Sequence, residues 1–348
     1  MWHGVLCALL SAALFGATAP IAKLLLPDAG PLSLGGLLYL GGGVGLVLVG
    51  LTRRPAPENQ PPREAALQRS DLPTLAAMII AGGVVGPALM LAGLARLSGM
   101  AGALLLNLEV PFTILLAVLA FGEHLGPLEA AGAALVVAGA GALGLRPGEV
   151  AGEAQGVLLI SAACLSWALD NNLAARLTVR DPVAVARAKT LGAGATLLVL
   201  AAATGAKLPP LSVVGAALVV GALGYGASLV LAYRATRALG AARQAAYFAS
   251  APFIGATLAV PLLGERPALV DALAATAMLA GVALLAHARH THAHTHDSVE
   301  HEHSHIHDEH HSHPHESPLS NPHSHRHRHD SITHDHPHVS DSHHRHRH

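Results

Sequence analysis

Ten apolar runs, each long enough to cross a lipid bilayer, dominate this chain of 348 residues. A helix needs about 20 mostly apolar residues to span the hydrocarbon core. Runs of this length that follow one another along the chain favour a membrane bundle over a soluble core. The sequence therefore predicts an all-α membrane protein with ten transmembrane helices. The predicted spans are His3–Pro27, Leu32–Thr52, Leu72–Gly93, Ser98–Phe121, Gly126–Leu145, Ala154–Leu177, Val183–Ala203, Leu211–Arg234, Leu239–Leu262 and Pro267–His287.

Composition agrees with a membrane bundle and excludes several functions. Only 12% of the residues are charged, against about a quarter in a soluble domain. The net charge is −1, so nothing points to nucleic acid. Cys7 and Cys164 both lie in apolar runs and form neither a disulfide framework nor a CxxC motif. An ATP-driven pump is disfavoured because no Gly-x-x-x-x-Gly-Lys-Ser/Thr loop occurs, and no pattern resembles an enzyme site.

The basic residues of the loops predict the orientation. With a cytoplasmic N-terminus, the inside loops hold more Lys and Arg than the outside loops, as the positive-inside rule requires. Both termini are therefore expected in the cytoplasm, in an inner (plasma) membrane of bacterial type. The inside set is Arg53, Arg54, Arg63, Arg69, Arg176, Arg180, Arg234, Arg237 and Arg289, and the outside set is Arg96, Arg146, Lys207 and Arg266.

The chain also repeats itself with an offset of 142 residues. Each half holds five spans, and because five is odd the second half enters the membrane the other way up. Inverted repeats are typical of secondary transporters, whose substrate site lies between the halves near the midplane. The predicted domains are a first repeat over 1–146, a second over 152–288 and a tail over 289–348. The offset pairs Gly122 with Gly264, Glu123 with Glu265, Glu129 with Asp271 and Gly139 with Gly281.

These stretches resemble the drug/metabolite transporter (DMT) superfamily, in particular its ten-helix EamA branch. The resemblance is carried by Ala12–Pro20, by Gly122-Glu123 with Gly132–Gly139, and by Pro252–Gly281. It covers about residues 1 to 288 and implies secondary export of small solutes. The chain departs from the family pattern where Val110 separates Glu109 from Pro111, and where His124 stands in place of the usual Arg.

Ionisable groups at membrane depth mark a pathway by default. Glu109 lies near the middle of the fourth span and Asp170 lies in the sixth, so the two could converge from opposite halves. Carboxylate and amide oxygens suit hard or borderline divalent cations, and a carboxylate could also carry a counter-transported proton. The predicted transport pathway consists of Glu109, Asp170, Asn107, Asn171, Asn172 and Lys23.

Each pathway residue also has a structural interpretation. Glu109 could serve helix packing, Asp170 could cap a helix or pair with Arg176, and Lys23 could snorkel to the interface or pair with a carboxylate. Glu123 and Glu265 lie at span ends, where a capping role is the simpler interpretation. Aromatic residues make up only 3% of the chain, which favours a small polar or ionic solute.

The last sixty residues differ completely from the rest. All histidines except His3 and His124 fall between His287 and His348, mostly as His-x-His with Asp and Glu interleaved. Imidazole is the commonest ligand for Ni, Co and Zn. With almost nothing apolar to bury, the tail is expected to be disordered without metal. The predicted metal ligands are His292, His294, His296, His301, His303, His305, His307, His310, His311, His313, His315, His323, His325, His327, His329, His334, His336 and His338.

Together these features predict a proton-coupled exporter of Ni²⁺ or Co²⁺, with Zn²⁺ a further candidate, whose cytosolic tail binds metal. His-tailed members of the resembled family look like nickel and cobalt resistance proteins, which adds weight. The alternatives are an exporter of a small organic metabolite whose tail only buffers or senses metal, and a membrane-anchored metal store. The fold requires no cofactor. The expected partners are the lipid bilayer, divalent cations or a small polar solute, and a second copy in a homodimer.

Overall fold

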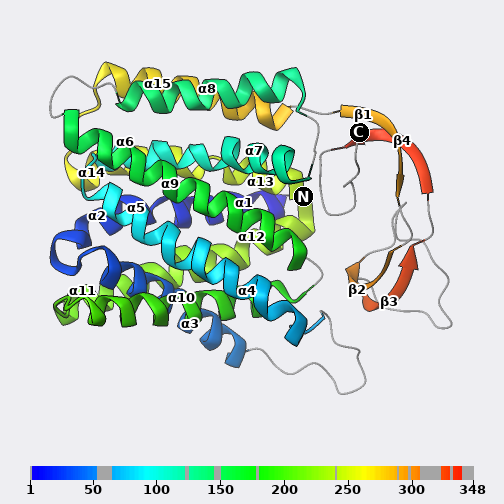
Figure 1. Cartoon of the computed structure of the whole chain (residues 1–348), viewed down its shortest axis with the longest axis horizontal. Coiled ribbons are helices and arrows are strands. Elements are labelled where there is room, and N and C mark those ends of the chain that lie inside the picture. The colour runs from blue at the N-terminus through cyan, green and yellow to red at the C-terminus, as the bar shows by residue number, and fades with distance from the viewer. Residues whose placement is uncertain are drawn as a thin grey trace.

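The computed structural model describes residues 2–52, 65–121, 125–144, 150–177, 180–239, 241–287, 290–296, 299–305, 323–329 and 332–338 (Figure 1). Up to residue 287, these residues form a bundle of roughly parallel and antiparallel helices. Its helices are α1 Trp2–Gly16, α2 Thr18–Ala29, α3 Pro31–Thr52, α4 Leu72–Met78, α5 Gly86–Leu94, α6 Gly99–Leu105, α7 Glu109–Phe121, α8 Pro127–Gly144, α9 Val150–Ala174, α10 Pro182–Ala203, α11 Leu211–Gly221, α12 Ser228–Leu239, α13 Ala241–Phe248, α14 Ala251–Leu263 and α15 Leu269–His287.

Five short helical turns connect these helices without interrupting the spans. Three are 3₁₀ turns and two are π-helices, in which the backbone bonds reach one residue further than in an α-helix. The 3₁₀ turns are η1 Arg69–Asp71, η3 Leu106–Leu108 and η4 Ala175–Leu177, and the π-helices are η2 Ile79–Val85 and η5 Ala222–Ala227.

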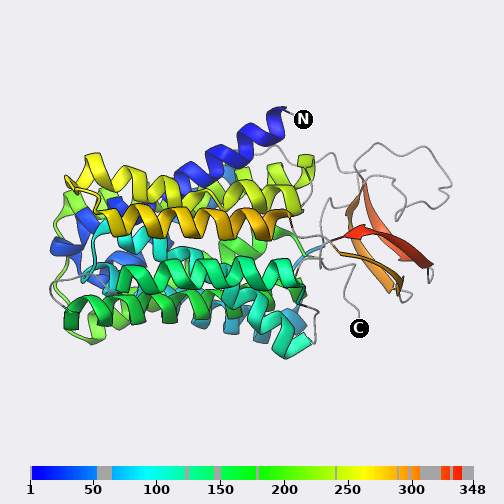
Figure 2. The ribbon, with the colours of Figure 1, turned by 90° about the horizontal axis from the view of Figure 1, so that it is seen from above.

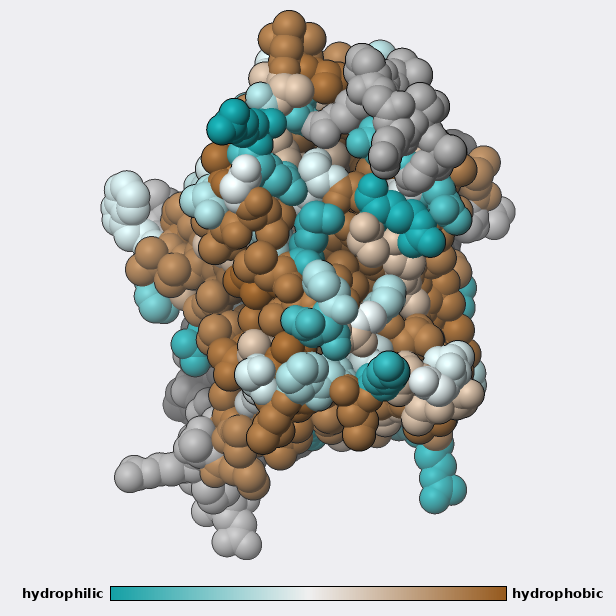
Figure 3. All heavy atoms as spheres, turned by 90° about the vertical axis from the view of Figure 1, so that its left-hand side faces the viewer, coloured by the Kyte–Doolittle hydropathy of each residue, from teal (hydrophilic) through white to brown (hydrophobic). Residues whose placement is uncertain are grey.

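The helical membrane architecture predicted from the sequence is confirmed. Over the described part of the chain, nine helical segments are long and apolar enough to cross a membrane. The remaining predicted span, Leu239–Leu262, is divided into α13 and α14 by a turn at Ala249 and Ser250. Figure 3 looks at the end of the bundle opposite the N-terminus, where hydrophilic residues lie among apolar ones.

The two halves are interleaved rather than side by side. Helix α3 packs along α10, α8 along α15, and α6 against α14, so each of these contacts joins equivalent spans of the two repeats. Two other large contacts, α1 with α12 and α5 with α9, are equivalent to each other: each joins the first span of one repeat to the third span of the other. The two repeats are therefore related by a pseudo-twofold axis. The centre of the bundle lies between them, where α5, η2 and α9 meet (Figures 1 and 2).

Residues that lie 142 positions apart in the sequence make equivalent contacts in the two repeats. Glu129 accepts a hydrogen bond from the Gly126 backbone N–H at 2.8 Å and caps the start of α8. Its repeat partner Asp271 accepts one from Ala268 N–H at 2.8 Å, at the start of α15. Both carboxylates thus satisfy an N–H that the first helical turn leaves free. The repeat is therefore a structural one.

Glycines let α8 and α15 approach closely. A Cβ added at Gly132 would lie 2.8 Å from the Gly281 carbonyl oxygen, and one at Gly281 would lie 2.6 Å from the Gly132 oxygen. Such contacts between small residues are a common way for helices to associate in lipid. The two final spans of the repeats form a tightly apposed pair at one side of the bundle (Figure 1).

The described backbone of the tail is extended and paired. His-x-His alternation has the two-residue period of a strand, and the antiparallel registers place His292 opposite His336 and His303 opposite His325. The pairs are β1 with β4 and β2 with β3. The strands are β1 His290–His296, β2 Val299–His305, β3 His323–His329 and β4 Ile332–His338.

Candidate transport site

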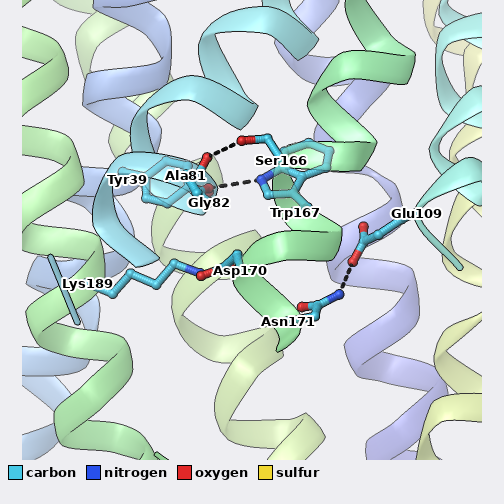
Figure 4. A network of polar contacts seen from close by, with 9 residues as sticks. All are labelled: Tyr39, Ala81, Gly82, Glu109, Ser166, Trp167, Asp170, Asn171 and Lys189. Atoms are coloured by element: carbon cyan, nitrogen blue, oxygen red, sulfur yellow. Dashed lines mark hydrogen bonds and ion pairs between the residues drawn. The ribbon is translucent and has the colours of Figure 1, made fainter. Parts of the chain in front are cut away.

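The π-helix η2 frees backbone carbonyls in the middle of the third span. Gly82 O accepts hydrogen bonds from Tyr39 Oη of α3 and from Trp167 Nε1 of α9, both at 2.9 Å, and Ala81 O accepts one from Ser166 Oγ at 2.8 Å (Figure 4). Unsatisfied carbonyls are costly in a bilayer, so these side chains stabilise the widened turn. They also fix the rotation of α9 against η2.

The repeat relates the two π-helices. Gly82 in η2 and Gly224 in η5 lie 142 residues apart, the same offset that pairs Glu123 with Glu265. π-Helices are rare and frequently occur at functional sites. Here the two π-helices occupy equivalent positions of the inverted repeats. The third span of each half is therefore a candidate for part of the functional site.

Asp170 of α9 faces this turn. It forms an ion pair with Lys189 of α10 through Oδ2, while its Oδ1 is buried and has no hydrogen-bond partner among the described residues. The residue is only 5% exposed. The absence of a side chain at Gly82 makes room for it, because a Cβ there would overlap with the carboxylate. Asp170 lies seven residues before Leu177, which places it about 10 Å inside the helix end.

Glu109 reaches the same region from the other half of the chain. Its Oε1 accepts a hydrogen bond of 2.7 Å from Asn171 Nδ2, and the Glu109 side chain is partly exposed. Asp170 and Asn171 follow one another on α9, and Figure 4 shows them pointing to opposite sides, one to Lys189 and one to Glu109. The fourth and sixth spans thus meet at Glu109 and Asn171, while Asp170, the next residue along α9, faces η2 and Lys189.

Two amides of the predicted pathway are used by the helices themselves. Asn172 Nδ2 donates to Ala168 O at 2.9 Å and weakly to Thr113 O at 3.4 Å, so Asn172 lies between α7 and α9 beside the centre. Asn107 is buried in the core and donates to Leu104 O at 2.9 Å. Among the described residues no contact joins Asn107 to the two carboxylates, and its side chain instead lies against Met278 of α15.

Lys23 lies away from Glu109 and Asp170, and among the described residues its ammonium bonds backbone carbonyls. Its Nζ donates to Leu94 O at 2.8 Å and Leu97 O at 2.5 Å, at the end of α5. The last carbonyls of a helix lack partners within it and carry partial negative charge. The ammonium therefore closes the C-terminal end of α5, at the bundle end opposite the N-terminus.

Glu265 serves the neighbouring helix start. It accepts hydrogen bonds from the backbone N–H groups of Gly99 and Met100, the latter at 2.9 Å. The carboxylate of the second repeat thus caps α6 of the first, as a capping role predicts. Its repeat partner Glu123 lies outside the described residues.

Sequence reasoning missed Lys189. The signal was present, since a lysine inside the predicted span Val183–Ala203 is an ionisable residue at membrane depth. It also named Arg176 as a local partner for Asp170, and the structure gives Lys189 instead. Arg176 lies six residues beyond Asp170, nearly two helical turns, and Asp170 is turned toward η2 and Lys189 of α10.

Several of the chain's few aromatic rings gather around the same centre. Tyr39 and Tyr225 have ring centroids 4.9 Å apart, Phe15 lies 5.8 Å from Tyr225, and Phe248 lies 5.2 Å from Phe15. Trp167 and Tyr39 meet at the Gly82 carbonyl. The low aromatic content therefore hides a local concentration of rings beside the carboxylates.

The metal-binding potential of the centre is limited. Within the described residues no three His, Cys, Asp or Glu side chains lie close enough to hold a metal ion. A cation at the centre would rely on the two carboxylates of Glu109 and Asp170 together with amide or backbone oxygens, which suit a hard cation or an ammonium group. Of the predicted tail ligands, His307, His310, His311, His313 and His315 lie outside the described residues.

Comparison with known proteins agrees with this architecture. The model of the EamA-like transporter family matches residues 2–145 and again residues 154–286. The chain belongs to the EamA-like transporter family. An uncharacterized transporter of Methanothermobacter thermautotrophicus is 30% identical over 285 residues, which cover 78% of this chain and 82% of the relative. A crystal structure with 20% sequence identity has the same fold, with a TM-score of 0.59 over 81% of this chain and 97% of that chain.

Membership in this family places the protein among multi-pass membrane transporters and away from enzymes. The DMT and EamA resemblance found in the sequence is thus confirmed, and the membrane-spanning helices contact the lipid bilayer. The roles of Glu109, Asp170 and the tail histidines remain predictions.

Proposed function

We propose that this EamA-type transporter is a secondary exporter of a divalent metal cation, Ni²⁺ or Co²⁺ with Zn²⁺ as a further candidate, coupled to protons. The observation that carries the proposal is the buried Oδ1 of Asp170, which no described residue pairs, next in sequence to the Asn171 that binds Glu109. A buried oxygen without a partner is costly, and a site that binds a cation retains such an oxygen for it. The pair offers oxygen ligands from both halves of the chain.

The tail supports a metal as the cargo. Its histidines are the preferred ligands for these ions, and in the predicted orientation they would hold metal on the cytoplasmic side, next to the entrance of an exporter. Glu109 and Asp170 can also carry protons when no cation is bound, so one site can exchange metal for protons across an inner membrane. No bound nucleotide is needed for this cycle.

The aromatic rings beside the carboxylates favour a second candidate, an organic ammonium compound. Rings attract cations over their faces, and they do so more strongly when the site is desolvated. In this case the tail would buffer or sense metal without supplying the cargo. The two candidates share a cationic substrate and differ in its size and hydration.

The test is metal content in cells that gain the protein. Expression should lower cellular Ni, Co or Zn and raise tolerance to the same metal, measured by elemental analysis and growth. A matched strain that produces the Glu109→Gln, Asp170→Asn double variant in equal amounts should behave like the empty strain. Unchanged content of all three metals would refute metal export, and uptake of an organic ammonium probe by proteoliposomes would then support the second candidate.

A further inference from the structure

Lys189 is a cation built into the centre of the bundle. It lies seven residues into α10, a span that also packs along α3, and its side chain is 19% exposed. A lysine at this depth is costly unless it is paired or lines a hydrated path. Among the described residues, its ion-pair partner is Asp170, one of the two carboxylates of the candidate transport site.

The two carboxylate oxygens of Asp170 differ in their partners. Lys189 pairs with Oδ2, and the buried Oδ1 has no hydrogen-bond partner within the described part of the chain. Glu109 accepts a hydrogen bond from Asn171, the residue that follows Asp170 on α9. With all three groups ionised, two carboxylates face one ammonium, and the centre carries one uncompensated negative charge. A pair that served only to join α9 to α10 would need neither the second carboxylate nor the open oxygen.

We propose that Lys189 is the tethered counter-cation of the transport site: its ammonium occupies Asp170 when the site is empty, and a substrate cation that binds between Asp170 and Glu109 displaces it. This inference rests on the proposed function. A divalent cation that binds the open Oδ1 of Asp170 lies close to the ammonium on Oδ2, and the repulsion between the two positive charges favours displacement of Lys189. The four-carbon stem of lysine lets the charge move away without moving the helix.

The Lys189–Asp170 pair sets the affinity of the site for its substrate as well as the net charge of the site. A transport site must bind its substrate firmly enough to capture it and weakly enough to release it. Displacing Lys189 subtracts from the binding energy on entry, and the returning ammonium competes with the substrate on exit. Lys189 therefore keeps a site with two carboxylates from holding a divalent cation too tightly.

If Lys189 is a counter-cation, its removal changes KM and the maximal rate in a way that the removal of a purely structural ion pair does not. If Lys189 only joined two helices, its removal would lower yield or thermal stability and leave the KM for substrate unchanged or higher. If it competes with the substrate, its removal lowers both the KM and the maximal rate, because the cation then binds an unopposed carboxylate pair and leaves slowly. A joint fall of KM and maximal rate is the pattern expected when ground-state binding has become stronger.

The experiment measures Ni²⁺ transport by the full chain in proteoliposomes. Lys189→Met is expected to lower the KM for Ni²⁺ by about tenfold or more, equivalent to at least 1.4 kcal/mol of binding, with a lower maximal rate. Lys189→Arg keeps the charge and should keep a KM near that of the unmodified protein. The matched control is Lys207→Met, which removes an exposed lysine from the loop between α10 and α11 and should change neither quantity.

The outcomes separate the two claims. If the unmodified protein moves no Ni²⁺, both the proposed metal export and the inference fail. If it moves Ni²⁺ and Lys189→Met has the same or a higher KM, only the inference is overturned. Should Lys189→Met fail to reconstitute, Lys189→Gln supplies a neutral residue that can still donate a hydrogen bond to Asp170, and the same fall in KM is required of it.

Discussion

Gly82→Ala tests whether the close approach of η2 to Asp170 positions the site. The alanine Cβ would overlap with the carboxylate of Asp170 and lie 2.7 Å from its Cβ. The Asp170 side chain is too short to bend away from such a contact. Either the helices must separate or Asp170 must rotate, and rotation breaks its ion pair with Lys189.

The two responses differ in cost. Overpacking that is relieved by small backbone shifts costs about 1–3 kcal/mol, whereas breaking a buried ion pair costs about 3–5 kcal/mol. The cheaper response prevails, so we expect Gly82→Ala to lower the free energy of unfolding by about 1–3 kcal/mol. Because the shift displaces Asp170 from its place between Lys189 and α7, we also expect transport to fall by at least about tenfold.

Two other glycines provide matched controls. A Cβ at Gly141 on α8 or at Gly215 on α11 would meet no atom within 4 Å. Replacing either with alanine should gain about 0.5–1 kcal/mol of helix propensity and leave transport unchanged. The assays are thermal unfolding of the purified variants in one detergent and initial transport rates in proteoliposomes at equal protein content. A Gly82→Ala protein as stable and as active as Gly141→Ala would refute the positioning role of this contact.

Three further predictions concern the carboxylates Glu109 and Asp170, the histidine-rich tail, and Glu265, which caps α6. Glu109→Gln and Asp170→Asn should each abolish transport while membrane insertion, followed by fractionation, stays normal; wild-type rates in both would remove these residues from the pathway. Truncation after Arg289 should weaken metal export without ending it, whereas complete loss of export from cells would make the tail part of the transport cycle. Glu265→Ala should lower unfolding stability by about 1 kcal/mol through loss of the α6 cap, and Arg266→Ala, which removes an exposed neighbour, should not change the thermal midpoint.

The bounds of most membrane spans could be predicted from the local sequence. Runs such as Val183–Ala203 and Leu211–Arg234 begin and end within a few residues of the observed helices, because their length and apolarity are set by the bilayer. The break between α13 and α14 was not apparent. Apolar composition continues through Ala249 and Ser250, and hydropathy does not report a local turn.

The candidate site could be predicted only in part. Asp170 and Glu109 stood out as charges inside apolar runs, since the cost of such charges in lipid does not depend on the fold. The same cost argument applies to Lys189, which was overlooked, and to Lys23, whose partners are backbone carbonyls that no sequence pattern reveals. The π-helix at Gly82 was also hidden, because its carbonyls are satisfied by side chains from two other spans.

The sequence by itself determined that this chain crosses a membrane many times, that its two halves repeat in opposite orientations, and that it ends in a histidine-rich tail. Hydrophobic length, residue offsets and composition are local properties, and the bilayer converts them directly into spans. Only the tertiary structure decided which polar groups meet. It paired Asp170 with Lys189, joined Glu109 to Asn171 and separated both from Asn107 and Lys23. The physical reason is that helix rotation and packing, fixed by small contacts such as Gly82 against Asp170, set the direction of every side chain in the bundle.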